Sequence, residues 1–174
     1  MISIGKMGYF FRYDKVKYKN PVKFPEIAEE MEQLKKAGQD ARGEFTKLTE
    51  VFQKNFKSFR MDRVSQWMNQ AQVARPAFWR YFIEEGQDEG NPSFALRLFY
   101  NDDELGVYVE LSFIGNVSNR DELIKAVKEG EIRKVILRRP VFLESTKDGI
   151  EEELTDALKE LIPFYETISM NEVN

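Results

Sequence analysis

The strongest constraint on the fold is a pair of alternating stretches separated by a short acidic segment. Between Phe94 and Tyr100, and again between Val107 and Phe113, every second residue is a large apolar one. A period of two is typical of β-strands. Residues 101–104, which lie between the stretches, are Asn, Asp, Asp and Glu and favour a turn. We therefore predict an antiparallel hairpin with a buried face made of Leu96, Leu98, Val109 and Leu111.

Further strands are predicted on both sides of this hairpin. The aromatic-rich stretch from Phe78 to Ile83 precedes a loop of turn-forming residues and should pair with the 94–100 strand. A fourth strand is expected from Ile132 to Leu137, with a break at Pro140. The sheet should therefore contain a three-stranded meander and one additional strand.

Helical periodicity appears mainly towards the two ends of the chain. Apolar residues recur at helical spacing on either side of Gly38, so a helical hairpin is predicted over residues 24–58. A short helix is predicted over residues 118–127. An amphipathic helix is expected over residues 149–168, and Pro163 should end or bend it.

These elements predict an α+β fold with an N-terminal helical hairpin, an antiparallel sheet of about four strands and a C-terminal amphipathic helix. A length of 174 residues suits one domain. We therefore expect a single α+β domain over residues 1–174, with the hairpin at 24–58, mostly sheet at 59–138 and the closing helix at 149–168.

The sequence contains neither histidine nor cysteine. These side chains supply most protein nucleophiles, near-neutral acid–base groups and soft metal ligands. Serine–histidine and cysteine–histidine catalytic units, disulfides, and metal sites built from thiolates or imidazoles are therefore excluded. The glycine-rich patterns of phosphate-binding loops and dinucleotide folds are also missing. We expect a non-enzymatic protein with no cofactor and no metal.

Carboxylates are the acid–base groups that remain. Glu84 and Glu85 close one predicted strand, and residues 102–104 form the acidic turn. Such clusters could hold a hard cation such as Mg²⁺ through oxygen ligands. Acidic side chains at exposed turns are also common for reasons of turn geometry, and we favour that interpretation.

The hydropathy of the chain bears on its location. No apolar run approaches the ~18 residues of a membrane span, and the first residues lack the apolar stretch and cleavage site of a signal peptide. We therefore expect a cytoplasmic protein that has no membrane partner.

The net charge of −4 conceals a segregation of charge along the chain. Basic residues predominate in 1–24 and in 42–80, whereas acidic residues predominate in 84–110. If the two basic segments lie side by side, they form a positive face. The alternative is that they belong to separate, solvated helix surfaces.

Residues 65–81 form the segment that most suggests a ligand. It combines both tryptophans with several amides and two arginines. Aromatic rings stack on bases, amides hydrogen-bond to base edges and arginine holds phosphate. The alternative places the aromatic residues in the core and the amides in a capped loop. Because Phe78 and Trp79 are adjacent in a predicted strand, they should point to opposite faces of the sheet.

From Trp79 onward the sequence is WRYFIEEGQ, followed by the strand to Tyr100, the acidic turn Asp103-Glu104-Leu105 and a strand ending at Ser112. This order resembles the N-terminal DNA-binding domain of McrB-type modification-dependent restriction systems. The polar residues 65–75 and the predicted closing helix are similar in character to parts of that domain. The resemblance implies binding of DNA.

The whole chain also resembles a small uncharacterised bacterial family that has carried a glucose-6-phosphate dehydrogenase label. That activity needs a dinucleotide fold and a histidine base, and this sequence has neither a glycine-rich fingerprint nor a histidine. The residues therefore argue against dehydrogenase activity.

We predict a non-enzymatic nucleic-acid-binding domain whose partner is DNA or RNA, with a modified or flipped base as a further hypothesis. The alternative is a protein–protein interaction or scaffolding module that forms a homodimer. The predicted contact residues are Trp67, Asn69, Gln70, Gln72, Arg75 and Trp79, together with a basic helix face of Lys54, Lys57, Arg60 and Arg63.

Overall fold

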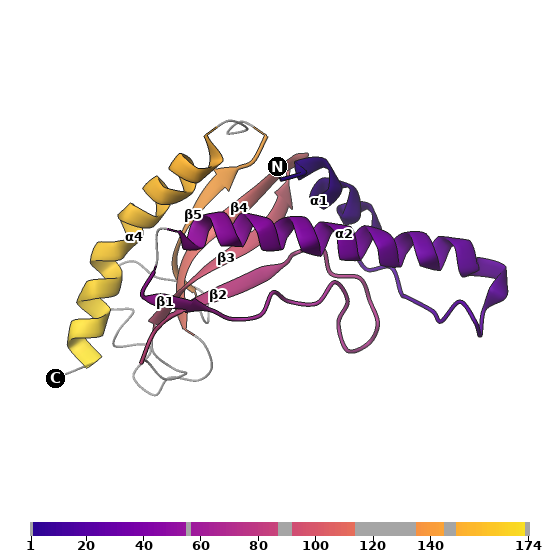
Figure 1. The fold of residues 1–174 in the computed structure, drawn as a ribbon, viewed down its shortest axis with the longest axis horizontal. Coiled ribbons are helices and arrows are strands. Elements are labelled where there is room, and N and C mark those ends of the chain that lie inside the picture. Colours follow the sequence, from indigo (N-terminus) through magenta and orange to yellow (C-terminus); the bar gives the residue numbers. More distant parts are fainter. Residues whose placement is uncertain (1, 55–56, 87–91, 114–134, 145–148, 173–174) are drawn as a thin grey trace.

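The computed structural model describes residues 2–54, 57–86, 92–113, 135–144 and 149–172 (Figure 1). Its helices and strands follow one another as α1 (Ile4–Phe10), α2 (Ala28–Gln53), β1 (Phe59–Met61), β2 (Trp79–Glu84), β3 (Pro92–Asn101), β4 (Glu104–Phe113), β5 (Val135–Phe142) and α4 (Ile150–Glu172). Within these ranges the strands form one antiparallel sheet in the order β1-β2-β3-β4-β5, so that each strand pairs with the next. The α+β class is confirmed, with five described strands where about four were expected.

The predicted hairpin is confirmed as β3 and β4. Leu96 lies opposite Val109, and all four residues of the predicted buried face are fully buried. The strands are joined at Asp102 and Asp103, whose φ angles are 47° and 63°. Two successive positive φ angles give a two-residue turn whose twist matches that of the flanking strands. Aspartate tolerates this conformation better than most residues, which explains the acidic turn.

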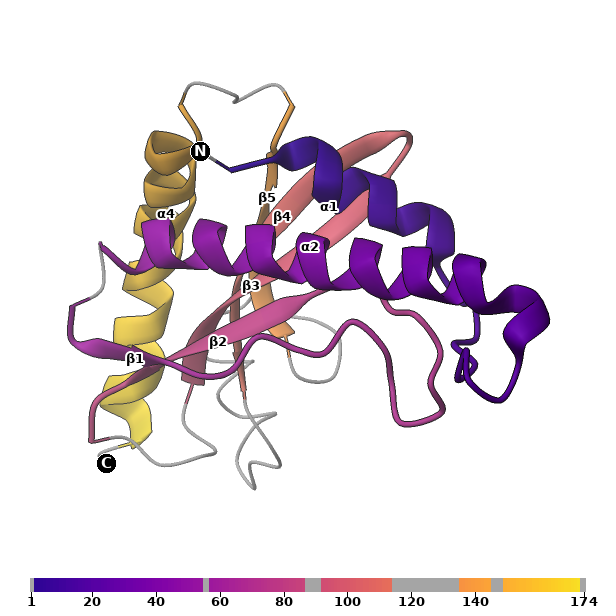
Figure 2. The same cartoon turned by 45° about the vertical axis from the view of Figure 1, so that its right-hand side comes forward.

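The helices α1 and α2 pack on one face of the sheet (Figures 1 and 2). Phe45 of α2 stacks on Phe78, just before β2, with ring centroids 5.9 Å apart, and Phe10 of α1 stacks on the same ring at 5.8 Å. Two turns further along α2, Phe52 meets Phe82 of β2 at 4.9 Å. Alternate residues of a strand share a face, so these aromatic contacts form one continuous helix–sheet core.

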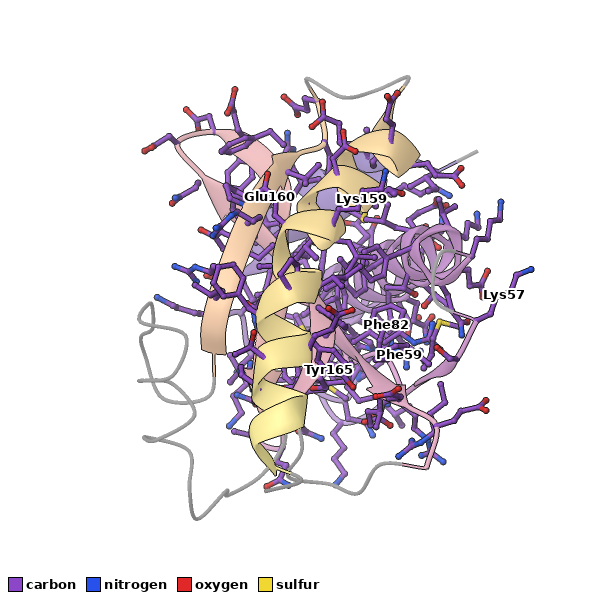
Figure 3. All side chains as sticks on the ribbon, turned by 90° about the vertical axis from the view of Figure 1, so that its left-hand side faces the viewer. Lys57, Phe59, Phe82, Lys159, Glu160 and Tyr165 are labelled. Carbon is purple, nitrogen blue, oxygen red and sulfur yellow. The ribbon has the colours of Figure 1, made fainter. Side chains whose placement is uncertain are left out.

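The helix α4 covers the same face over β5, β4 and β3, and Tyr165 extends its contacts to β1. Figure 3 shows Tyr165 of α4 beside Phe59 of β1. The Tyr165 ring lies 5.8 Å from that of Phe59 and 5.0 Å from that of Phe94, and its hydroxyl donates a hydrogen bond to Glu84. Glu84, which the sequence suggested as one member of an acidic cluster, is therefore engaged in holding α4 to the sheet.

The predicted helical hairpin over residues 24–58 is wrong, because α2 runs without interruption through Gly38. A Cβ atom at Gly38 would lie 2.7 Å from Cδ2 of Trp67, closer than real Cβ atoms approach another heavy atom. Glycine is therefore required here by the close approach of an indole ring, and it does not end the helix. The helix that packs beside α2 is α1, from the start of the chain, and not a second half of a hairpin (Figure 2).

Two prolines lie inside elements that they were expected to interrupt. Pro140 lies within β5, an edge strand of the described sheet, where proline is tolerated. Pro163 lies within α4. Because proline has no N–H, the Lys159 carbonyl four residues earlier loses its helical hydrogen bond. Both residues are exposed, so water can take the place of that donor. The predicted helix at 118–127 and the first residues of the predicted 132–137 strand lie outside the described residues.

Glu44 holds the start of the chain against α2. Its carboxylate is 5% exposed, accepts a hydrogen bond from the Ser3 amide at 2.8 Å, and lies 3.1 Å from Lys47 Nζ and 3.8 Å from Lys6 Nζ. Burial alone raises the pKa of this carboxyl group. The Ser3 amide and the two ammonium groups outweigh that effect, so the pKa of Glu44 is lowered.

The Gly38 contact predicts opposite effects for two alanine substitutions in α2. Gly38→Ala should lower the free energy of unfolding by about 1–3 kcal/mol, because the added methyl group displaces Trp67. Gly43→Ala should raise it by about 0.5–1 kcal/mol, since nothing lies near its Cβ position and alanine favours a helix. Urea unfolding followed by tryptophan fluorescence measures both, and equal effects would contradict the Trp67 contact.

The lowered pKa of Glu44 predicts a pH-dependent contribution to stability. The contribution should be present above the ordinary glutamate pKa of about 4.3 and should be lost as the pH falls below it. Glu44→Gln should therefore lower the free energy of unfolding by about 1–2 kcal/mol at pH 7 and by less at pH 3. Urea unfolding at both values tests this, and a loss that is the same at both would contradict it.

Candidate functional site

Two arginines hold the segment between β1 and β2 beneath α2. Arg42 of α2 donates hydrogen bonds from Nε to the Ser65 carbonyl at 3.0 Å and from Nη2 to the Val64 carbonyl at 2.8 Å. Arg80 of β2 donates from Nε to the Asp62 carbonyl at 2.6 Å. Burial lowers the pKa of Arg80. Both arginines were counted in the basic 42–80 segment, yet their guanidinium groups are occupied by these structural contacts.

This segment continues into a tight turn at residues 69–73. The backbone N–H of Asn69 donates to the Val73 carbonyl at 2.9 Å, and the backbone N–H of Val73 donates to the side-chain oxygen Oδ1 of Asn69 at 3.0 Å. Gln72 has a φ of 60°, and its backbone N–H donates to the backbone carbonyl of Asn69 at 2.9 Å. Asn69 therefore has the loop-capping role of the alternative interpretation, while the side chains of Gln70 and Gln72 remain exposed.

The N-terminal basic segment pairs with the far side of this turn. Lys17 forms an antiparallel bridge with Val73. The Ala74 amide N–H donates to the Val16 carbonyl at 2.8 Å, and the Tyr18 amide N–H donates to the Gln72 carbonyl at 2.7 Å. The two basic segments therefore do lie side by side at this point. We call the paired residues 15–19 and 72–75 the basic ladder.

Trp67 lies in the core beneath the basic ladder. Only 7% of it is exposed. Its ring lies against Gly38 and meets the rings of Phe10 and Tyr18 edge-on at 6.4 and 5.5 Å. Since no face of the indole is free, the prediction that Trp67 contacts a base is wrong. The alternative that placed it in the core holds for this tryptophan.

Trp79 has a different environment. Phe78 is fully buried and Trp79 is only half-buried, as expected for neighbours that point to opposite faces of a strand. The guanidinium carbons of Arg75 and Arg97 lie 5.3 and 5.4 Å from the centroid of the Trp79 ring. Both distances are within the range of cation–π contacts.

Arg97 and Arg75 differ in their other contacts. Arg97 lies opposite Trp79 in the β2–β3 register, and its Nε lies 3.0 and 3.2 Å from the two carboxylate oxygens of Glu110, whose side chain is 0% exposed. Arg75 is exposed and has no ion pair within the described residues. Arg97 thus fixes the Trp79 ring, whereas the charge of Arg75 remains available to a ligand.

A hollow of about 550 Å³ lies beside Trp79. Asn69, Gln70, Arg75 and Trp79 line it, together with Ser65 and Gln66. Four of the predicted contact residues are therefore brought together, and we call this space the Trp79 hollow. Its volume falls in the ~300–1,000 Å³ range of small-ligand pockets.

The predicted basic helix face does not form. Lys54 lies at the end of α2, Arg60 lies on β1 and Arg63 follows β1, so these residues are not on one helix. β1 pairs antiparallel with the end of β2 that is remote from Trp79, which places Lys57 roughly 17 Å or more from the Trp79 hollow by strand rise. In Figure 3, Lys57 points away from the body of the protein. Lys57 is therefore separate from the site, whereas Arg63 lies two residues before Ser65, which lines the hollow.

A second set of cationic and aromatic residues, which was not predicted from the sequence, lies on the sheet face of Trp79. Tyr108 of β4 lies opposite Arg97, and its ring lies 4.2 Å from the guanidinium carbon of Arg138 on β5. Phe99 stacks on Tyr108 at 4.1 Å. The predicted hairpin already contained this signal, because its turn aligns position 97 with position 108.

In the described part of the chain, no three acidic groups converge into a set that could hold a metal ion. None of the described helices is long and apolar enough to cross a membrane. Comparisons with models of protein families, with curated proteins and with solved structures give no match.

The Arg97–Glu110 pair predicts a large effect for a small substitution. Glu110→Gln should lower the free energy of unfolding by about 2–3 kcal/mol, because it leaves Arg97 without its charged partner. The Arg97→Gln/Glu110→Gln double variant should lose less than the sum of the two single variants. Urea unfolding of the four proteins measures this coupling, and strictly additive losses would show that the pair is not coupled.

Proposed function

We propose that this protein is a nucleic-acid-binding domain of the cytoplasm and that it binds DNA or RNA at the Trp79 hollow. The observation that carries the proposal is the meeting of a partly exposed indole, an unpaired arginine and three amide side chains around one small space. Aromatic faces stack on bases, amides form directional hydrogen bonds to base edges and arginine holds phosphate. The proposal is for binding alone, with no catalytic step, metal or cofactor.

The size of the site favours a base that has left the helical stack. A volume of about 550 Å³ accommodates a group the size of a nucleobase. An unstacked base is available in a single strand or by flipping from a duplex. The resemblance of the 79–112 region to McrB-type DNA-binding domains supports a modified or flipped base as the specific form of ligand.

An interaction module that forms a homodimer is the competing proposal. It is favoured by the exposed large apolar side chains of the described residues, which are Tyr9, Val16, Val22, Phe24 and Tyr100. A stable interface takes about 20–30 residues from each partner, far more than these five. The charge and polarity of the Trp79 hollow therefore make nucleic acid the better-supported ligand.

The proposal predicts a graded response at Trp79. Trp79→Ala should weaken binding of a short oligonucleotide by about 1–3 kcal/mol through lost stacking, whereas Trp79→Phe should retain most of the affinity. Fluorescence anisotropy at low salt, with methylated and unmodified oligonucleotides as single strands and duplexes, measures both variants. Thermal unfolding of each variant provides the control for folding.

The outcomes of this titration are distinct. Loss of affinity in Trp79→Ala and its retention in Trp79→Phe support a stacking site. Absence of binding by the unaltered protein at about 100 μM, the weak end of nonspecific affinity, would refute the proposal. A dimer in sedimentation experiments together with no nucleic-acid binding would favour the interaction module.

A further inference from the structure

The basic ladder presents Lys17, Lys19 and Arg75 on one side, and Lys15 lies at its start, where a φ of 66° ends the extended segment. Tyr18 faces inward, since its ring meets that of the buried Trp67. In an extended segment, neighbouring residues point to opposite sides, so Lys17 and Lys19 point outward. Lys17 is the bridge partner of Val73, and Arg75 is two residues further along, in a diagonal position at roughly 7–8 Å. The outward charges therefore continue from the N-terminal segment to the rim of the Trp79 hollow.

In the described part of the chain, several of these cations have no carboxylate partner, in contrast to Lys6, Lys47 and Arg97. Within the described residues, Lys15, Lys17 and Arg75 have no carboxylate partner, and all are exposed. Lys19 is also exposed, and its ammonium group lies over the Phe24 ring at 5.4 Å. A group of free cations held by backbone hydrogen bonds is a site for a polyanion.

We propose that the ligand is single-stranded nucleic acid whose backbone follows the basic ladder, with Lys15, Lys17, Lys19 and Arg75 at its phosphates and one base in the Trp79 hollow. This inference rests on the proposed function and names its ligand class. Residues two apart on a strand are about 7 Å apart, so outward-facing lysines at this spacing can each contact a separate phosphate of an extended strand. Arg75 belongs to both the ladder and the hollow and connects the two parts of the site.

A single strand suits the ladder better than a duplex. The free cations follow one narrow line, whereas a duplex presents two phosphate backbones separated by grooves of about 6 and 12 Å. A flexible strand can follow the ladder and still place a base in the hollow.

The test compares the salt dependence of binding between variants. For a single strand the slope of log K against log salt is about −0.7 for each phosphate contacted. Lys17→Gln should make the slope less negative by about 0.7, and Lys15→Gln/Lys17→Gln/Lys19→Gln should change it by about 2. Affinity of the triple variant at low salt should fall roughly tenfold or more. Lys159→Gln on α4, which removes one exposed lysine far from the ladder, is the matched control and should leave the slope unchanged.

The controls separate this inference from the proposed function. If the unaltered protein binds no oligonucleotide, the proposed function fails. If it binds and the triple variant binds equally well with the same slope, the ladder is not the phosphate site, although the hollow stands. Tighter binding of a duplex than of its single strand would overturn the ligand class. Equal competition by an acidic polypeptide such as polyglutamate would also overturn it, because the ladder would then select charge alone.

Discussion

The contact between Gly38 and Trp67 sets the position of every part of the candidate site. The first half of α2 extends beyond the sheet (Figures 1 and 2), and Trp67 packs on it where glycine leaves room for the ring. The Arg75 amide N–H donates to the Trp67 carbonyl at 2.8 Å, so the return strand of the turn is anchored to the same residue. The basic ladder and the Trp79 hollow therefore depend on a helix–indole contact that neither of them includes.

Alternation along β2 separates the helix–sheet core from the proposed binding site. Phe78, Arg80 and Phe82 point toward the helices and build the core, whereas Trp79, between the first two, points to the other face. The ion pair of Arg97 with the buried Glu110 then holds the Trp79 ring from that face. Because an indole packed on an ordered guanidinium has little freedom to lose, the entropic cost of the proposed binding is reduced.

Local sequence patterns predicted the parts of the fold that depend on near neighbours. The β3–β4 hairpin was foreseen because its alternation and its turn lie within 20 consecutive residues. Gly38 was misinterpreted because its role is set by Trp67, and a glycine in a helical pattern is ordinarily a sign of a helix end. For the same reason the composition of residues 65–81 could suggest a ligand site but could not distinguish a core tryptophan from a surface one.

The bridge between Lys17 and Val73 joins segments that are remote in sequence, and no periodicity marks it. Counting charges along the sequence indicated only two basic segments that could combine. The count for residues 42–80 included Arg42 and Arg80, whose guanidinium groups instead donate to backbone carbonyls. Lys6 and Lys47 are likewise directed to Glu44. Exposed charges are screened over about 10 Å at 0.1 M salt, so the potential that a ligand meets depends on the cations that remain free nearby, and much less on the net charge of −4. A chain with a net negative charge can therefore present a positive surface to a polyanion, provided that its free cations lie together and apart from its carboxylates.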